Sequence, residues 1–396
     1  MLAGWDILCL STQDWDALPT RKHRFMRWFA EGGNRVLYVE QQMHWAGWLA
    51  DLRHQWARAF RWLGGPRQVA PNLWIYTLPP VIPFFQMFRW INRLNNWLLR
   101  PILRTQLKRL GFDRLILWTY TPHSGDFVGQ LGEALAVYEC VDEFSAARGL
   151  VRAETIRALE QELIARCDLL IVTAQALHDS KKDAARRIIL IPNGAEVAHF
   201  NKAADPATPI TPALAGLPQP IVGFLGAVQY WVDVPLLARI ARQHPEWSVV
   251  LVGPPGLLVD LSELERLPNA HLLGRVPYAD LPGYLRAFDV CLNPYKMDGV
   301  AEGCSPIKLY EYLATGKPIV SVDMPEAHQF EHLIHVARDA DAFVQQVEAA
   351  VSEAGGPESR DRAAQRMAEA ERHTWRGRFE AAQAALLETL AEKGLT

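Results

Sequence analysis

The sequence predicts an α/β protein of two domains, each built on a doubly wound, mainly parallel sheet. Short runs of branched apolar residues alternate with amphipathic helical stretches along most of the chain, as buried parallel strands and their covering helices do. A chain of 396 residues suits two domains, and 49% hydrophobic with 21% charged residues is an ordinary globular composition. Disordered, collagenous and coiled-coil chains are therefore excluded.

The first series of elements ends near residue 200. Amphipathic periodicity predicts helices over 21–31 and 152–166, set between runs rich in Val, Ile and Leu. The expected strands are 6–10, 35–39, 114–118, 136–140, 168–173 and 187–191. We therefore expect a first domain over 1–200.

The second series predicts a domain over 201–373. Residues 201–220 contain five prolines and little periodicity, which favours an interdomain linker. The strands expected after it are 220–225, 248–252, 270–273, 289–293 and 318–322. A final helix, within 374–396, could pack back on either domain. Two facing domains of this kind would leave a cleft at the carboxyl ends of their strands, where such sheets bind ligands.

The segment 44–110 differs from the rest of the chain in charge. It holds ten Lys or Arg against one acidic residue, so it carries +9 while the remainder carries −12, and it holds seven of the 14 tryptophans. Apolar residues step by three or four over 45–63 and 84–102, which predicts two amphipathic helices with Arg and Asn on the opposite faces.

Basic amphipathic helices rich in Trp and Phe are typical of a membrane interface, with their rings at headgroup depth and Arg near anionic lipid. We therefore expect 44–110 to contact an anionic membrane surface. The alternative is that the apolar stripes pack on the protein's own core while the Arg face is merely solvated. Nucleic acid is not expected, because the rest of the chain is acidic and no nucleic-acid-binding module is present.

The sequence gives no sign of a membrane span, a leader or a metal site. No uninterrupted apolar run reaches 18 residues, and the first six residues lack a basic stretch followed by an apolar one. Five cysteines are scattered singly, without any C-x-x-C. This spacing disfavours disulfides and zinc and indicates a reducing, cytoplasmic compartment.

Two stretches of the second domain carry candidate ligand-binding chemistry. The run IVGFLGA, ending at Gly226 and Ala227, places glycines at the end of a buried strand, where backbone amides can approach a phosphate. The run does not complete G-x-G-x-x-G, so a structural turn is an equally good interpretation. The second stretch, SPIKLYEYLATGKPIV, predicts a ten-residue helix with Ser305 as N-cap, Pro306 as first residue and Gly316 as its stop.

On that helix, Lys308 and Glu311 are three residues apart and share one face. An ammonium beside the positive end of a helix could neutralise a diphosphate, and a carboxylate could accept hydrogen bonds from the two hydroxyls of a ribose. From spacing alone, a surface ion pair worth a few tenths of a kcal/mol explains the pair equally well.

The string SPIKLYEYLATGKPIV resembles the donor-site helix of GT-B glycosyltransferases, particularly the large, mostly retaining bacterial family called group 1 or family 4. IVGFLGAVQYWVDVPLLARIARQHPEWSVVLVGP resembles the first strand, helix and second strand of that family, and HLLGRVPYADLPGYLRAFDVCLNPY its nucleobase-contacting stretch. In the first half, ILIPNGAEVAHF resembles the domain-closing segment. VYECVDEFSA and the N-terminal stretch resemble a subset acting on cell-surface polysaccharide precursors.

The resemblance implies a GT-B fold and a donor site for a nucleotide diphosphate sugar, UDP- or GDP-linked, without cofactor or metal. Glu311 would hold the ribose, Lys308 and nearby amides the pyrophosphate, and Arg275 with Val276 the base. The implied donor-binding residues are Gly226, Ala227, Gln229, Gly253, Arg275, Val276, Ser305, Pro306, Ile307, Lys308 and Glu311.

The chain departs from the family pattern at two places. The acidic residue that touches the donor sugar lies eight positions before the ribose glutamate in the family, whereas this chain has Gly303 there and Glu302 one residue earlier. The usual Arg and Lys after the first glycine strand are replaced by VQYW, from Val228 to Trp231, which leaves Lys308 as the evident phosphate cation.

In the first domain, His123 and Asp142 follow expected strands and would face the donor. His123 could hydrogen-bond the transferred sugar or the leaving phosphate, and Asp142 could orient or deprotonate an acceptor hydroxyl. Together with Glu302 they are the candidate catalytic residues. Asp14, Arg21 and His23, between the first strand and helix, could contact an acceptor phosphate. For His123 the alternative is an ordinary structural histidine.

Taken together, the sequence predicts a metal-independent glycosyltransferase of hexosyltransferase type. It would move a sugar, with retention, to a lipid-linked or other saccharide acceptor at the inner face of the cell membrane. A nucleotide-sugar epimerase of GT-B-like fold and a non-catalytic, membrane-associated nucleotide-sugar-binding protein remain as alternatives.

Overall fold

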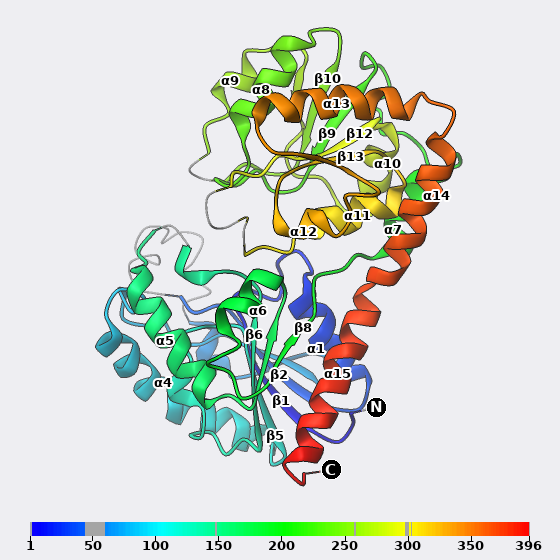
Figure 1. The fold of residues 1–396 in the computed structure, drawn as a ribbon. Helices are drawn as coiled ribbons and strands as arrows, with labels where there is room; N and C mark the ends of the chain where they lie inside the picture. The colour runs from blue at the N-terminus through cyan, green and yellow to red at the C-terminus, as the bar shows by residue number, and fades with distance from the viewer. Residues whose placement is uncertain are drawn as a thin grey trace. The chain divides into compact units, whose positions relative to one another are not determined.

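The computed structural model describes residues 2–43, 60–146, 149–256, 259–297, 301 and 303–395. The chain forms two compact units: Met1–Pro192 together with Phe379–Thr396, and Asn193–Arg378 (Figure 1). The second unit therefore begins eight residues before the expected boundary.

An eight-stranded sheet forms the centre of the first unit, in the order β3-β4-β2-β1-β5-β6-β7-β8. All neighbours are parallel except β3 and β4, the antiparallel pair at one edge. The strands are β1 (Asp6–Leu10), β2 (Arg35–Val39), β3 (Arg67–Ala70), β4 (Leu73–Tyr76), β5 (Leu115–Thr119), β6 (Leu135–Cys140), β7 (Leu169–Val172) and β8 (Ile188–Leu190).

Helices cover both faces of this sheet. They are α1 (Arg21–Glu31), α4 (Arg89–Leu110), α5 (Ala153–Arg166) and α6 (Gln175–Lys181), with short 3-10 turns η1 (Arg61–Gly64), η2 (Gly125–Phe127) and η3 (Phe144–Ala146). Alternate side chains of each central strand point to opposite faces, so every strand must be apolar throughout. This explains why the strands read as continuous apolar runs.

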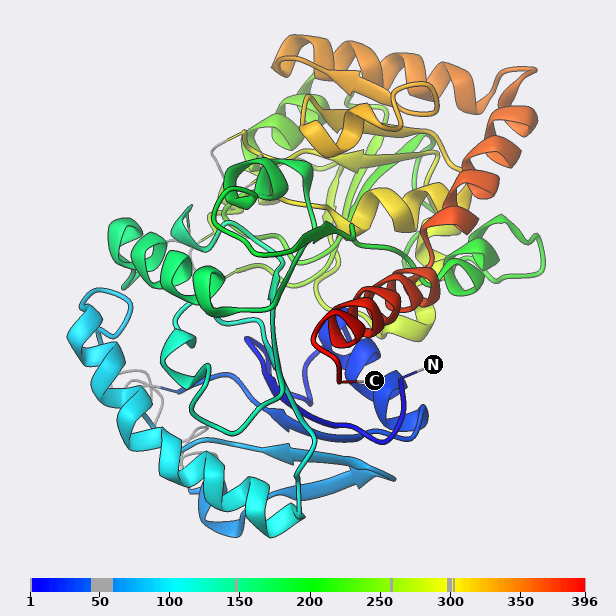
Figure 2. The same cartoon turned by 60° about the horizontal axis from the view of Figure 1, so that its bottom comes forward.

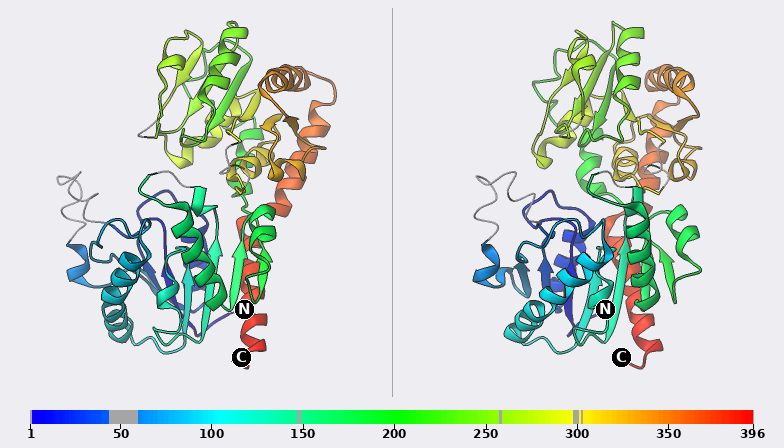
Figure 3. Two further views of the ribbon diagram at one scale, coloured as in Figure 1. Left: turned by 60° about the vertical axis from the view of Figure 1, so that its left-hand side comes forward. Right: turned by 90° about the vertical axis from the view of Figure 1, so that its left-hand side faces the viewer.

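The helix α15 (Trp375–Glu392) closes one face of the first unit. Phe379 is buried among the rings of α1, with its centroid 4.8 Å from that of Phe29 and 5.5 Å from that of Phe25. Figure 3 shows α15 on the opposite face of the sheet from α4 and α5. The last residues of the chain thus supply core to the first unit.

The second unit has a six-stranded, wholly parallel sheet in the order β11-β10-β9-β12-β13-β14. Its strands are β9 (Ile221–Leu225), β10 (Ser248–Val252), β11 (Ala270–Leu272), β12 (Val290–Asn293), β13 (Ile319–Val322) and β14 (His335–Ala337). This is the strand order of a dinucleotide-binding sheet, and the order reverses between β9 and β12. A ligand is expected at the carboxyl ends of those two strands.

The helices of the second unit again cover both faces. They are α7 (Val197–Phe200), α8 (Val234–Gln243), α9 (Ser262–Glu265), α10 (Leu281–Ala287), α11 (Ile307–Thr315), α12 (Pro325–His328), α13 (Ala340–Ala354) and α14 (Ser359–Ala370), with 3-10 turns η4 (Asn201–Ala204), η5 (Tyr278–Asp280) and η6 (Glu371–His373). One core cluster joins α8 and α13 to the sheet, and another joins α7, α10 and α11 to its other face.

Three expectations about local structure were wrong. Residues 201–220 are not a linker, because Ala203 and Leu214 lie in the core of the second unit and the Arg286 side chain donates to Thr208 O of this segment. The segment is irregular because of its prolines, yet its few apolar residues are enough to anchor it. The strands β3 and β4 were missed inside 44–110, and β14 was missed near the end of the second series.

The helix expected over 84–102 is α4, drawn in cyan in Figure 2, and it begins later, at Arg89. Its polar face was misassigned. Asn92, Asn95 and Asn96 are buried rather than solvated, because their side-chain amides bind backbone of neighbouring loops. The other helix expected in this segment lies almost wholly in 44–59, outside the described residues, as do Trp45, Trp48 and Trp56. None of the described helices is both long and apolar enough to cross a membrane.

Candidate functional site

The helix α11 holds the central pair of charged residues in the second unit. It follows β12, one of the two strands between which the strand order reverses. Lys308 Nζ lies 2.9 Å from Glu311 Oε2, and the Glu311 side chain is only 8% exposed. The pair is therefore not the solvated surface ion pair that spacing alone allowed.

The glycine loop after β9 lies directly beneath Lys308. A Cβ atom on Gly226 would be 2.6 Å from Lys308 Cε, and the φ of Gly226 is +146°, which only glycine adopts readily. Gly253, at the end of β10, has the same kind of backbone, and a Cβ there would be 2.0 Å from Gly226 O. Glycine at both positions allows the lysine stem and two strand ends to meet.

Tyr312 fixes the distance between α11 and this loop. Its buried hydroxyl accepts a hydrogen bond of 2.8 Å from the N–H of Leu225, the last residue of β9. The Gly226 N–H donates to Val252 O of β10, so it is already paired. Of the two amides expected to face a phosphate, the Ala227 N–H is the candidate that is left.

The start of α11 differs from the expectation. The helix begins at Ile307, its N-cap position is Pro306, and no side chain caps it. Ser305 is not the cap, because its buried hydroxyl donates a hydrogen bond of 3.1 Å to Glu326 Oε1 and accepts one of 3.1 Å from the N–H of Asn193. The serine thus anchors the first residue of the second unit, and the helix N-terminus keeps its free amides.

The other expected donor residues lie at the same edge of this sheet. Gln229 belongs to the loop after β9, where its side chain packs against Gly256, and Arg275 and Val276 follow β11. Arg275 is exposed and Val276 half-buried. Glu302 lies outside the described residues. No group of three or more His, Cys, Asp or Glu residues that could hold a metal ion occurs in the part of the chain that the structure describes.

In the first unit, His123 lies at the carboxyl end of β5 and is 7% exposed. Its Nε2 is 3.1 Å from Gln42 Oε1, whereas its buried Nδ1 has no hydrogen-bond partner among the described residues. Asn92 and Asn96 of α4 each donate a hydrogen bond of 2.9 Å to the His123 carbonyl oxygen, and these bonds fix the loop after β5. Burial lowers the pKa of His123 to about 4, so the ring is neutral near pH 7.

The three expected acceptor-side residues make contacts within the first unit. Arg21 pairs with the buried Glu139 and donates 2.9 Å to Ile191 O. The Nδ1 atom of His23 accepts a hydrogen bond of 3.2 Å from the N–H of Thr20, and its Nε2 atom lies 3.0 Å from the carbonyl oxygen of Asp14. These contacts fix the loop between β1 and α1, and Asp14 is half-buried in it.

Lys22, between those two residues, was missed by the sequence analysis. It is 8% exposed, its ammonium lies 5.2 Å from the centre of the Tyr120 ring, and it has no hydrogen-bond or ion-pair partner among the described residues. Burial lowers its pKa, and the charges of Asp142 and Glu139 act in the opposite direction. Asp142 is exposed at the carboxyl end of β6. Because Lys22 stands among apolar and basic neighbours in the sequence, periodicity gave no signal for it.

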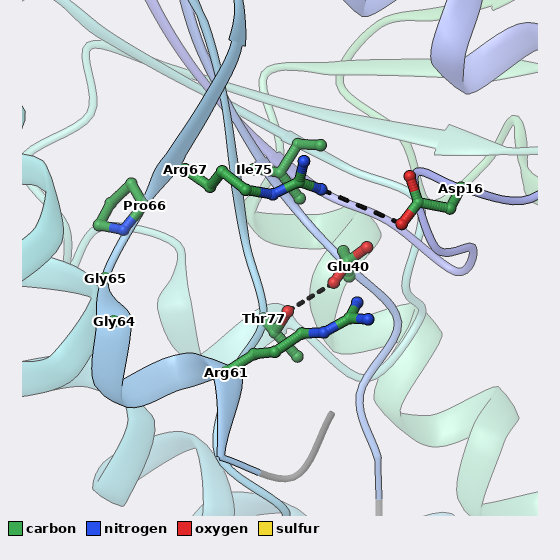
Figure 4. Close-up of a pocket in the computed structure, with 9 residues that line it drawn as sticks. All are labelled: Asp16, Glu40, Arg61, Gly64, Gly65, Pro66, Arg67, Ile75 and Thr77. Carbon is green, nitrogen blue, oxygen red and sulfur yellow. Dashed lines mark hydrogen bonds and ion pairs between the residues drawn. The ribbon is translucent and has the colours of Figure 1, made fainter. Parts of the chain in front are cut away.

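The first unit also contains a hollow that the sequence did not predict (Figure 4). It measures about 710 Å³ and lies at the carboxyl ends of β2 and β4, beside η1 and β3. Its lining consists of Asp16, Glu40, Arg61, Gly64, Gly65, Pro66, Arg67, Ile75 and Thr77.

Comparison with known proteins identifies the class to which this architecture belongs. The solved structure of sucrose-phosphate synthase from Thermosynechococcus elongatus superposes with a TM-score of 0.70, at 16% identity, over 98% of this chain and 100% of that one. The structure of Anabaena HepE in complex with UDP and glucose superposes with a TM-score of 0.64, at 14% identity, over 97% of this chain and 99% of that one. The fold is GT-B, as expected from the sequence.

Residues 219–353 match the family model described as Glycosyl transferases group 1. A protein of Bacillus subtilis (strain 168), TuaH, whose name assigns it provisionally to teichuronic acid biosynthesis as a glycosyltransferase, is 29% identical over 208 residues. These make up 49% of this chain and 52% of TuaH, so the match spans about half the length of that relative. The resemblance to the GT-B glycosyltransferases of group 1 is thereby confirmed.

The buried state of His123 makes stability depend on pH. The unfolded ring binds a proton near pH 6.5 and the folded ring only near pH 4, so the unfolded state holds more protons between these values. We expect the free energy of unfolding to fall by up to about 3 kcal/mol through this group as the pH drops from 6.5 to 4. Urea unfolding across this range should show a shallower dependence for His123→Asn. The matched change in the exposed His328 should leave the slope unaltered, and equal slopes for both variants would contradict the assignment.

Proposed function

We propose that the protein is a glycosyltransferase that moves a sugar from a nucleotide diphosphate sugar to a saccharide acceptor. The observation that carries this proposal is the Lys308–Glu311 pair, held at the start of α11 over the glycine loop of β9. The group 1 match over 219–353 covers this whole arrangement and gives it a precedent.

In the proposed donor complex, the ligand replaces the contact between Lys308 and Glu311. The Lys308 ammonium, the Ala227 N–H and the first amides of α11 would bind the diphosphate, because together they present positive charge and unpaired donors. The Glu311 carboxylate would accept from the ribose hydroxyls, and the stretch at Arg275 and Val276 would flank the base. Gly253, Gln229 and residues 305–307 would shape the loops, and Glu302 would approach the sugar.

In the proposed reaction, the bond between the sugar C1 and the diphosphate oxygen breaks and a new bond forms from C1 to an acceptor oxygen. The acceptor proton passes to the leaving diphosphate, so retention of configuration requires no protein nucleophile and no metal. In the first unit, Asp142 would orient the acceptor hydroxyl, Lys22 would bind an oxyanion and the neutral His123 would hydrogen-bond the sugar. We propose a hexose as the transferred sugar.

Three findings support the choice of donor and acceptor to test first. HepE structures hold UDP and UDP-glucose, which makes UDP-sugars the first donors to examine, followed by GDP-sugars. TuaH is named for teichuronic acid biosynthesis, and by analogy we propose a lipid-linked saccharide as the acceptor. The third finding is an exposed apolar face on α4.

That face suits a cytoplasmic protein that lies on the inner surface of the membrane. Trp90 and Trp97 are 65% and 63% exposed, and Leu94 and Leu98 lie beside them on the same face of α4. The exposed Arg93, Arg104 and Lys108 follow along the helix, and its 22 residues include no acid. Indole rings and basic side chains on one helix face fit an anionic lipid interface.

The donor site is tested by nucleotide binding. A calorimetric and thermal-shift panel of UDP-, GDP-, ADP- and dTDP-sugars should give one strong binder. Glu311→Ala should weaken it by about tenfold or more, because two hydrogen bonds to a charged group are lost. Glu348→Ala, an exposed carboxylate on α13, is the matched control and should bind as the wild type does.

Unchanged binding by the Glu311 variant would refute the pocket. With a bound donor, transfer to a lipid-linked saccharide supports the proposed reaction. Isomerisation of the sugar without an acceptor would identify an epimerase instead, and binding without turnover on any acceptor would identify a non-catalytic binding protein.

The membrane face is tested by flotation with vesicles of phosphatidylcholine and phosphatidylglycerol. The double change Trp90→Ser and Trp97→Ser should lower the floated fraction at least about fivefold, because the two aromatic rings that would insert into the lipid interface are removed. Ile210→Ser, which removes an exposed apolar side chain from the second unit, should have no effect. Equal flotation of all three proteins would show that α4 does not bind lipid.

A further inference from the structure

The hollow at the carboxyl ends of β2 and β4 has the chemistry of a saccharide site. At its base lies Glu40, which is 3% exposed. One carboxylate oxygen accepts a hydrogen bond of 3.1 Å from the N–H of Trp15, and the other accepts one of 2.5 Å from the hydroxyl of Thr77. These two bonds fix the carboxylate plane, and each oxygen retains a further lone pair for a ligand hydroxyl.

Two arginines line the hollow together with this carboxylate. Arg61 comes from η1 and Arg67 from β3, and Figure 4 shows the Arg61 side chain extending toward Glu40 and the Arg67 side chain extending toward Asp16. Arg67 is 4.0 Å from Asp16, with both side chains more than half exposed. An exposed pair at that distance is weak and screened by solvent, so a ligand anion can displace Asp16 from Arg67 at little cost.

The charges of the hollow select the kind of ligand. Two arginines and two carboxylates cancel, so a small free anion gains little from the site as a whole. A ligand gains from both signs only if it carries an anion for the forked guanidinium groups and hydroxyls for Glu40. A sugar that bears a carboxylate or a phosphate has this combination.

A narrow crevice beside the hollow shares Glu40 as a wall. Ser11, Gln42, Thr121 and His123 line this crevice, which runs along the carboxyl ends of β2, β1 and β5. The carboxylate thus stands between the arginines on one side and the His123 loop on the other, all within the first unit. The crevice has a volume of only about 10 Å³, so a sugar would have to lie in the hollow itself.

We propose that the hollow between η1, β3 and the ends of β2 and β4 binds an anionic sugar residue of the acceptor, with Arg61 and Arg67 on its anion and Glu40 on its hydroxyls. This inference deepens the proposed function and rests on it for the word acceptor, although the binding site itself stands on the first unit alone. The shared chemistry is a sugar anion, which a uronic acid carboxylate or a sugar phosphate could supply.

The test is saturation-transfer NMR on the full chain, with UDP present to occupy the donor site. The probes are glucuronate, glucose 6-phosphate and glucose, each alone and with inorganic phosphate at equal concentration as a competitor. We expect one or both of the sugar anions to give a signal at least about fivefold above glucose, and phosphate to leave this signal largely unchanged, because only a sugar anion engages both charge types. The stronger of the two identifies the source of the anion.

Variants separate the two halves of the site. Arg61→Glu with Arg67→Glu should reduce the sugar-anion signal to that of glucose, whereas Arg152→Glu, an exposed arginine paired with Glu154, should not change it. Glu40→Gln should weaken all sugars, with a thermal unfolding scan to confirm that the variant is folded. A glucose signal equal to that of the sugar anions, or no change in the arginine variant, would overturn the proposal.

Binding of UDP is recorded in the same samples. If UDP binds but no sugar anion does, the hollow is not an acceptor site and the donor proposal survives. If sugar anions bind but no nucleotide does, the hollow is a saccharide site and the transferase proposal fails.

Discussion

The ion pair of Lys308 and Glu311 lies against the backbone of Gly226. Because Gly226 has no side chain, the lysine stem can pack on the end of β9, and there its ammonium contacts the Glu311 carboxylate. The Tyr312 hydroxyl then fixes the helix to the strand end at Leu225. The parallel sheet determines where these parts meet, because the strand order reverses between β9 and β12.

The loop beside the Lys308–Glu311 pair has fewer cations than the family pattern. The loop after β9 reads VQYW and contributes no positive side chain, so the proposed donor site would rely on the Lys308 ammonium, backbone amides and the start of α11. A single cation paired with a carboxylate is partly neutralised until a ligand separates them. In the proposed mechanism a diphosphate does this, and the freed carboxylate becomes the acceptor for the ribose.

Much of the fold could be predicted from the sequence because buried parallel strands are apolar on both faces. Asp6–Leu10, Arg35–Val39 and Ser248–Val252 have the bounds that their residues predicted, as does the helix Arg21–Glu31. The edge strands β3 and β4 were missed because they are short, and half of β3 is exposed and polar. The α4 asparagines were misplaced because a polar residue was expected at the surface, whereas three of them satisfy loop backbone in the interior.

In the candidate site, too, some residues could be predicted from the sequence and others could not. Lys308 and Glu311 stand three residues apart in one motif and Gly226 ends another, so each of these motifs could be recognised in the sequence. Lys22, Glu40 and the arginines of the hollow come from separate elements of the first unit, and only the sheet order brings Glu40 next to Thr77. Ser305 looked like a helix cap because Ser-Pro is a common helix start, but its hydroxyl is used by Glu326 and Asn193, which no local pattern reveals.

The proposed phosphate contact of Lys308 is tested most directly by comparing a nucleoside diphosphate with its parent nucleoside in calorimetric titrations of the wild type and Lys308→Met. If the ammonium binds phosphate, the variant should lose about tenfold or more in affinity for the diphosphate and stay within about twofold for the nucleoside. An equal loss for both ligands, or no loss for either, would mean that Lys308 serves only to hold Glu311 and that the proposed phosphate site does not exist.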